Sequence, residues 1–122
     1  MTTNVVAVDH AILFIFDPAS SDIKIPEYDP SVPVASNNAC LSVNVRAAVD
    51  GDVQVHIGQS PEIRLSSPVV FNGKLTTPSG RIVVVTPSNE EVVSFENEDE
   101  TAELTVRLDS FEGASEVWVE VA

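Results

Sequence analysis

Apolar and polar residues alternate strictly along several short stretches of this 122-residue chain. The clearest is residues 102–108, where Ala, Leu, Val and Leu alternate with Glu, Thr and Arg. The same period of two recurs over residues 41–47, 53–57 and 116–121. Because successive side chains of a β-strand point to opposite faces, this period predicts antiparallel strands with one face toward the solvent.

Two further stretches are apolar on both faces. Residues 11–16 read Ala-Ile-Leu-Phe-Ile-Phe, and residues 82–85 read Ile-Val-Val-Val. Runs of this kind predict strands that are covered on both sides, inside a sheet. Valine is abundant throughout the chain, and no stretch has the apolar spacing of an amphipathic helix. The fold is therefore expected to be all-β.

Turn residues separate these runs. Asp50-Gly51-Asp52 predicts a hairpin between the strands on either side of it, and Asn72-Gly73 predicts a second turn or a bulge. Further turn residues stand at 78–80, 87–89 and 112–114. About eight short strands at this spacing predict an antiparallel β-sandwich with Greek-key-like connections, forming a single domain over residues 1–122.

The segment from residue 17 to residue 38 breaks the pattern. It holds four prolines among Ser, Asp and Asn residues, which predicts an irregular connection with a short edge strand over residues 23–25. Two explanations of so long a connection stay open. It is a functional loop, or it is the crossover between two sheets that a Greek-key sandwich needs.

Charge is distributed unevenly. The chain has 19 acidic and 6 basic residues, and residues 82–122 hold 11 of the acids but a single base, Arg107. Residues 90–103 hold seven acids and no base. Such a field repels nucleic acids and anionic membranes, and it attracts cations and basic protein surfaces. Because the few basic residues are scattered, direct nucleic-acid binding and membrane binding are not expected.

The acidic stretch has two explanations. It is a solvated surface that keeps the protein soluble, or it is a charged surface that a basic protein partner, such as a nuclease, binds in place of phosphates. Trp118 shares the polar strand face with Glu116 and Glu120, which makes it a candidate anchor for that partner unless another segment covers it. The candidate partner-binding residues are Glu90, Glu91, Glu96, Glu98, Asp99, Glu100, Glu103, Glu116, Trp118 and Glu120.

Catalytic motifs are not evident. His10 and His56 fall within predicted strands, and neither accompanies a nucleophile elbow or a catalytic-cysteine signature. His10 is expected to be hydrogen-bonded and half-buried. Clustered His and Cys residues, which a transition-metal site needs, are also missing. We therefore expect no enzyme activity, no catalytic residue and no cofactor.

Calcium provides an alternative from another class. Two predicted loops carry aspartates, and if they met at one end of the sandwich they would supply several oxygen ligands, although their spacing matches no calcium motif. The candidate ligands are Asp17, Asp22, Asp29, Asp50 and Asp52. A third possibility is a structural subunit whose strand edges pair with copies of itself.

Cellular location is indicated by what the sequence lacks. The single cysteine, Cys40, cannot form an intramolecular disulfide, which is typical of a reducing cytosol. The first residues lack the basic start of a signal peptide, and the longest apolar stretch is too short to cross a membrane. A cytoplasmic protein is expected.

One stretch resembles a known family. Residues 9–16, Asp-His-Ala-Ile-Leu-Phe-Ile-Phe, resemble the first strand of the competence protein J family, in which a histidine also precedes an aromatic and aliphatic run. The order of later segments is similar, at residues 39–48, 53–58, 68–71 and 81–86. That family is a small β-sandwich whose named member inhibits a DNA-entry nuclease. The resemblance implies a nuclease inhibitor or an immunity-type protein, and it transfers no catalytic residue.

Overall fold

The computed structural model describes residues 1–21, 23–27, 29, 31–59 and 67–122. The strands and short 3-10 helices of this part of the chain are β1 (Thr2–Val6), η1 (Asp9–Ala11), β2 (Ile12–Phe16), β3 (Val34–Ser36), β4 (Cys40–Asn44), η2 (Ala48–Asp50), β5 (Val53–Gln59), β6 (Val69–Thr76), β7 (Arg81–Val85), β8 (Glu91–Glu96), β9 (Thr101–Leu108) and β10 (Glu116–Val121). None of these described helices has the length and apolar character needed to cross a membrane.

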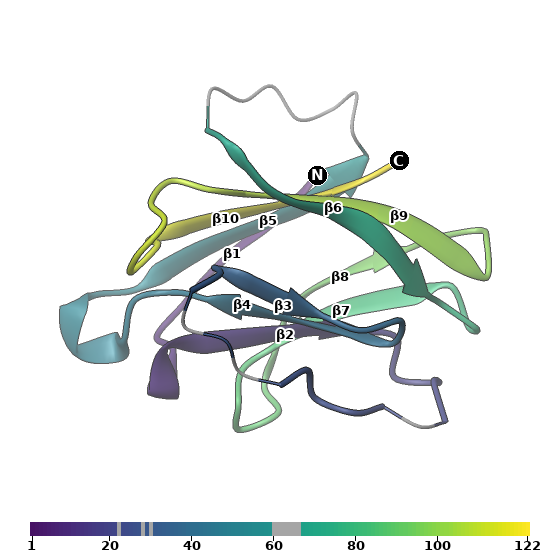
Figure 1. Ribbon diagram of the computed structural model, residues 1–122, viewed down its shortest axis with the longest axis horizontal. Helices are drawn as coiled ribbons and strands as arrows, with labels where there is room; N and C mark the ends of the chain where they lie inside the picture. The colour runs from purple at the N-terminus through teal and green to yellow at the C-terminus, as the bar shows by residue number, and fades with distance from the viewer. Residues whose placement is uncertain (22, 28, 30, 60–66) are drawn as a thin grey trace.

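Two five-stranded sheets pack face to face (Figure 1). The first sheet has the order β1-β5-β10-β9-β6, and the second has the order β3-β4-β2-β7-β8. The predicted antiparallel β-sandwich is confirmed. One pair departs from it, since β10 runs parallel to β5, with Val117 opposite Val55. The hairpin from β9 fixes the direction of β10, which then inserts between β9 and β5.

The core lies between the sheets and is built from the apolar positions that alternate along the strands. The inward residues of β5, β9 and β10 are almost fully buried, as the period of two predicts. Opposite them lie the inward residues of β2, β4 and β7. The residues concerned are Val53, Val55, Ile57, Leu104, Val106, Leu108, Val117, Val119 and Val121 in the first sheet, and Leu13, Ile15, Leu41, Val43, Ile82 and Val84 in the second.

The second sheet is apolar on its outer face as well, as predicted for β2 and β7. Val83 and Val85 of β7 expose only 2% and 6% of their surface, although they point away from the core. The connection from β2 to β3 lies on this outer side (Figure 1), where Ile23 and Phe16 line one groove. The apolar outer face is therefore a second, smaller packing layer.

The structure of this same connection differs from two expectations. It joins strands of one sheet, so it is not a crossover between sheets. The short edge strand is β3, and residues 23–25 form no strand. Pro26 directly follows those residues, and a proline restricts the residue before it and offers no N–H to a neighbouring strand. The segment after Pro33 has no such block and pairs with β4.

Two turn predictions also need correction. Asp50-Gly51-Asp52 does not close a hairpin, because β4 belongs to the second sheet and β5 to the first. Asn72-Gly73 lies inside β6, where Gly73 is opposite Leu104. A Cβ on Gly73 would lie 2.7 Å from Cζ of Phe71, so the missing side chain makes room for that ring. The β6 bulge comes earlier, between Val69 and Phe71.

The start of the chain differs from prediction too. Residues 2–6 form β1, at the edge of the first sheet. His10 lies in η1 and not in a strand, and it is exposed where half-burial was expected. Its φ of 63° and the φ of 56° at Ala11 turn the chain from the first sheet into the second.

Candidate functional site

A row of side chains crosses the outer face of the first sheet. Thr3, His56, Trp118 and Arg107 are register neighbours on four adjacent strands, β1, β5, β10 and β9. The imidazole of His56 stacks on the indole of Trp118, with ring centroids 5.6 Å apart. Trp118 exposes only 8% of its surface. The candidate anchor, which was expected to serve unless another segment covers it, is thus largely buried.

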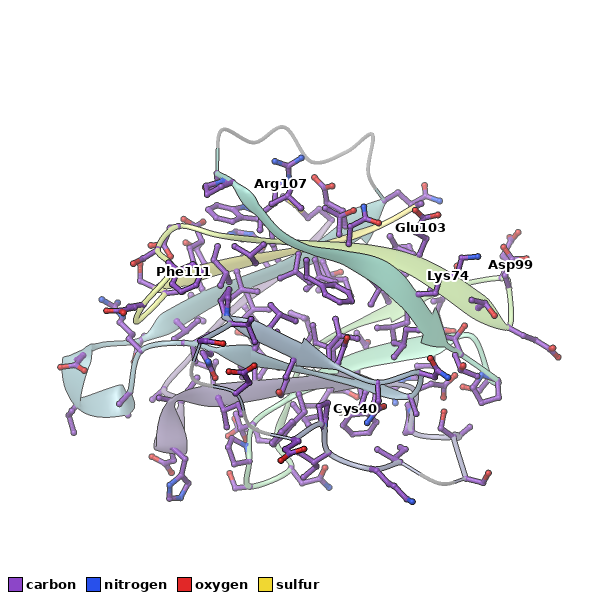
Figure 2. The ribbon with its side chains drawn as sticks, viewed as in Figure 1. Cys40, Lys74, Asp99, Glu103, Arg107 and Phe111 are labelled. Atoms are coloured by element: carbon purple, nitrogen blue, oxygen red, sulfur yellow. The ribbon has the colours of Figure 1, made fainter. Side chains whose placement is uncertain are left out.

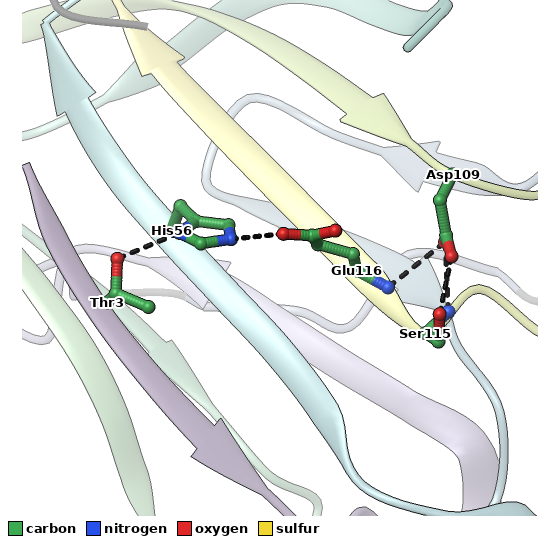
Figure 3. Close-up of polar contacts among 5 residues, drawn as sticks. All are labelled: Thr3, His56, Asp109, Ser115 and Glu116. Atoms are coloured by element: carbon green, nitrogen blue, oxygen red, sulfur yellow. Dashed lines mark hydrogen bonds and ion pairs between the residues drawn. The ribbon is translucent and has the colours of Figure 1, made fainter.

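His56 links three strands through its two ring nitrogens. Nδ1 lies 2.8 Å from the hydroxyl of Thr3, and Nε2 lies 2.7 Å from a carboxylate oxygen of Glu116 (Figure 3). Hydroxyl, imidazole and carboxylate follow in the order found in hydrolase triads. Here, however, the imidazole is also held flat against Trp118. The observed arrangement ties the edge strand β1 to β5 and β10.

Arg107 pairs with Glu120 on the same face of the sheet. Its Nε donates to Oε1 of Glu120 at 3.0 Å, and its Nη1 donates to the carbonyl oxygen of Ser67 at 2.8 Å. The Glu120 side chain exposes 9% of its surface. Glu116 and Glu120, both predicted to bind a partner, are therefore already paired inside the protein with His56 and Arg107.

The other seven predicted carboxylates are exposed, but they do not share one sheet face. Glu90 and Glu91 stand where β8 begins, in the second sheet, and Arg81 forms an ion pair with Glu91. Five residues at ~3.3 Å each place the end of β8 about 17 Å away. At that end lie Glu96, Glu98, Asp99, Glu100 and Glu103, which we call the acidic end.

The acidic end sits where the chain crosses from β8 to β9. The Thr77 hydroxyl donates to the carbonyl oxygen of Asp99 at 2.8 Å, and the Thr77 N–H donates to that of Glu100 at 2.7 Å. The side-chain amide of Asn97 also donates to the Asp99 carbonyl, at 3.0 Å. The backbone here is thus held from within, and its carboxylates point into the solvent. Asp99 and Glu103 can be followed in Figure 2.

Asp17 is a candidate calcium ligand in the sequence, but in the structure its carboxylate accepts hydrogen bonds from the protein itself. It is fully buried, and its carboxylate accepts from the Ser79 hydroxyl at 2.7 Å, the Ser79 N–H at 2.9 Å and the Ala19 N–H at 2.8 Å. Burial disfavours the charged form, but these hydrogen bonds outweigh it and lower the pKa of Asp17. The carboxylate fastens the end of β2 to the turn between β6 and β7.

The calcium candidates are not brought together. Because β2 and β4 are antiparallel, Asp17 lies at one end of the sandwich, and Asp50 and Asp52 lie at the other. Asp29 accepts hydrogen bonds from Ser31. Asp22 lies outside the described residues. Within the part of the chain that the structure describes, no three His, Cys, Asp or Glu residues are grouped to hold a metal ion.

The end opposite the acidic end is made by three connections, residues 7–11, 45–52 and 109–115, which we call the loop end. In the last of them, the carboxylate of Asp109 accepts from the backbone N–H groups of Ser115 and Glu116 at 2.9 and 3.0 Å (Figure 3). Partial burial opposes the charged form of Asp109, but these bonds and the Ser115 hydroxyl lower its pKa. A pocket at this end is lined by Phe111, which sequence patterns did not single out, and by Glu112, which they gave only as a turn residue.

The two stacked sheets define a class, that of small all-β sandwich proteins. Within it, the chain is similar to ComJ from Bacillus subtilis, an inhibitor of the DNA-degrading activity of NucA, with a TM-score of 0.70 over 99% of this chain and 94% of that one. It is also similar to the protein of crocagin biosynthetic gene J, with a TM-score of 0.55 over 98% and 96% of the two chains.

These likenesses concern the fold, because sequence identity is 11% with ComJ and 13% with the crocagin protein. No protein-family model matches the chain, and no curated protein matches it. The resemblance to the competence protein J family is confirmed at the level of the fold.

Proposed function

We propose that this protein is a non-enzymatic binding module, an inhibitor or immunity-type protein that presents a negatively charged surface to a basic partner such as a nuclease. The observation that carries the proposal is the fold shared with ComJ over nearly the whole length of both chains. ComJ inhibits a DNA-degrading activity, and a similar sandwich in this chain suits the same kind of task.

Charge supports the proposal independently of the fold. The chain has a net charge of −13, and the acidic end gathers five exposed carboxylates on a backbone that is held by internal hydrogen bonds. A nuclease binds a polyanion through a basic groove. Carboxylates fixed in space attract such a groove over a distance and compete with DNA for it.

The proposal places the protein in the cytoplasm, where thiols stay reduced. Cys40 exposes 1% of its surface, and burial raises the pKa of its thiol to about 11. A buried thiol of this kind is inert and serves as a small apolar side chain.

DNA-cleavage assays test the proposal. Purified protein is titrated into cleavage reactions with each purified basic nuclease of its host. We expect stoichiometric inhibition of at least one nuclease, weakening as salt rises because charged surfaces are screened. Failure to inhibit any of them, at low salt and with folded protein, would contradict the proposal.

Charge reversals locate the binding surface. Glu98→Lys with Glu100→Lys should abolish inhibition without unfolding the domain, since both side chains are exposed. The matched control reverses two exposed carboxylates on the long connection, Glu27→Lys with Asp29→Lys, and should retain most of the inhibition. Equal loss of inhibition in the two double variants would mean that inhibition depends on the net charge of the protein and not on the acidic end in particular.

A further inference from the structure

A pocket of about 430 Å³ opens at the loop end. Ile12 lines it from β2, Val45 from the residue after β4, and Pro33 from the approach to β3. Phe111 and Glu112 line it from the turn between β9 and β10. Figure 2 shows Phe111 at the opposite end of the molecule from Asp99, so the pocket is separate from the acidic end.

Backbone hydrogen bonds join the walls of this pocket. Val45 donates to the carbonyl oxygen of Ala11 at 3.0 Å, and Asn44 donates to that of Pro33 at 2.9 Å. On the Phe111 side, the Ser110 hydroxyl donates to the carbonyl oxygen of Glu112 at 2.7 Å. Walls held in this way lose little freedom when something binds between them, which favours affinity.

The backbone beside the pocket is unusual. His10 and Ala11, which both line it, have φ values of 63° and 56°, in the left-handed region that residues with a Cβ seldom occupy. Neither is a glycine, and they are consecutive. Backbone conformations of this kind gather at sites that bind ligands or partners, where the surrounding structure maintains them.

The chemistry of the lining selects one kind of occupant. Phe111 exposes 57% of its surface, so its ring is open to a partner, and Glu112, which follows it in the same turn, also lines the pocket. A cation binds both an aromatic face and a carboxylate, and a long aliphatic stem packs against Ile12, Pro33 and Val45. An anion would meet Glu112 and a chain of net charge −13, with His10 as the basic residue among the lining.

We infer that this pocket receives a basic side chain, specifically an arginine, from a protein partner. The planar guanidinium stacks on Phe111 and pairs with Glu112, while the three methylenes lie along the apolar wall. This part of the inference rests on the proposed function, in which the partner is a basic protein. The acidic end then steers that protein, and Phe111 and Glu112 anchor it.

Arginine and citrulline peptides test the pocket without any knowledge of the partner. The full chain, labelled with ¹⁵N, is titrated with acetyl-Gly-Arg-Gly-amide and with the citrulline peptide, which has the same shape and no charge. Arginine should shift the amide signals of the pocket residues saturably at millimolar concentration. Citrulline should bind at least about fivefold more weakly, because the charge-assisted pair with Glu112 is lost.

Three variants assign the binding to the lining. Phe111→Ala and Glu112→Gln should each weaken arginine binding about threefold to tenfold, and both residues are exposed, so the domain stays folded. Glu27→Gln removes the same charge from the long connection, outside both the pocket and the acidic end, and should leave the affinity unchanged. Loss of affinity in Glu27→Gln equal to that in Glu112→Gln overturns the assignment.

Other outcomes also overturn it. Shifts confined to the acidic end, or no saturable shift at all, remove arginine as the occupant. Sedimentation should show a monomer; a dimer that Phe111→Ala dissociates assigns the pocket to a second copy of the chain. Any of these results leaves the nuclease assays unaffected, so failure of the pocket and failure of the proposed function are distinguishable.

Discussion

The ring of His56 lies almost parallel to the ring of Trp118, at an interplanar angle of 12° and a centroid distance of 5.6 Å. The two residues are register neighbours across the parallel pair β5 and β10. Because both nitrogens of His56 are also hydrogen-bonded, the imidazole acts as a connector between β1, β5 and β10. Trp118 is the single tryptophan of the chain, so all tryptophan fluorescence comes from this position.

Removing the imidazole should loosen the first sheet. We expect His56→Ala to lower the free energy of unfolding by about 3 kcal/mol, through lost packing and a carboxylate left without its partner. His56→Phe keeps the stacked ring and should cost about half as much. Urea unfolding followed by Trp118 fluorescence measures both, and equal losses in the two variants would show that stacking contributes nothing.

Asp17 should make stability depend on acid pH. Its pKa is lowered in the folded protein, so its contribution is complete above the ordinary value of 3.8 and declines as pH falls through the folded value. Asp17→Asn should lower the free energy of unfolding by about 2 kcal/mol at neutral pH.

The difference between wild type and Asp17→Asn should then narrow as pH falls below 3.8, because the carboxylate gains its proton in the unfolded chain before it does in the folded protein, where its pKa is lower. Urea unfolding at a series of pH values measures it. A difference that stays constant across that range would show that the charge of Asp17 contributes nothing.

Two glycines with positive φ should respond differently to a methyl group. At Gly80, φ is 78° and a Cβ would lie 2.1 Å from the carbonyl oxygen of Asn97, so Gly80→Ala forces the backbone apart. At Gly113, φ is 63° but the nearest atom would be 3.9 Å away, on Arg46. Thermal unfolding should show a loss of at least about 3 kcal/mol for Gly80→Ala and about 1 kcal/mol for Gly113→Ala. Similar losses in the two variants would mean that the positive φ alone sets the cost of the added methyl group and that the close approach to Asn97 adds nothing.

The arginine–glutamate pairs at Arg107 and Arg81, both among the described residues, should differ in their effect on stability. Arg107→Met leaves the buried Glu120 unpaired and should cost about 3 kcal/mol. Arg81→Met breaks an exposed pair with Glu91 and should change stability by less than about 1 kcal/mol. Chemical denaturation of both variants compares them, with Arg107→Met plus Glu120→Leu as a control. That double variant should recover most of the loss, and no recovery would argue against the unpaired charge as its cause.

The period of two predicted β5, β9 and β10 correctly because one face of each strand packs on the core, and burial on one face leaves a local trace in the sequence. The hairpin predicted at Asp50-Gly51-Asp52 was wrong because turn residues report a change of direction and not the sheet that the next strand joins. β1 was missed because its polar residues Thr2, Thr3 and Asn4 carry no such period.

The candidate site was harder to predict. Alternation correctly placed Trp118 on one face with Glu116 and Glu120, but nothing local shows which strands become neighbours. His56 and Glu116 are 60 residues apart, and only the parallel register brings them together. The concentration of acidic residues at the acidic end could be read from the composition of the sequence. That these residues are divided between two sheets could not, because it depends on the crossover from β8 to β9.

The position of β10 has a consequence for how this protein is made. In the first sheet, β1 and β5 form one antiparallel pair and β9 and β6 form another, and β10 is the strand that joins them. A nascent chain in which β10 is still inside the ribosome therefore has unpaired edges on both β5 and β9, which are templates for intermolecular pairing. Correct assembly of the first sheet must wait until β10 has emerged.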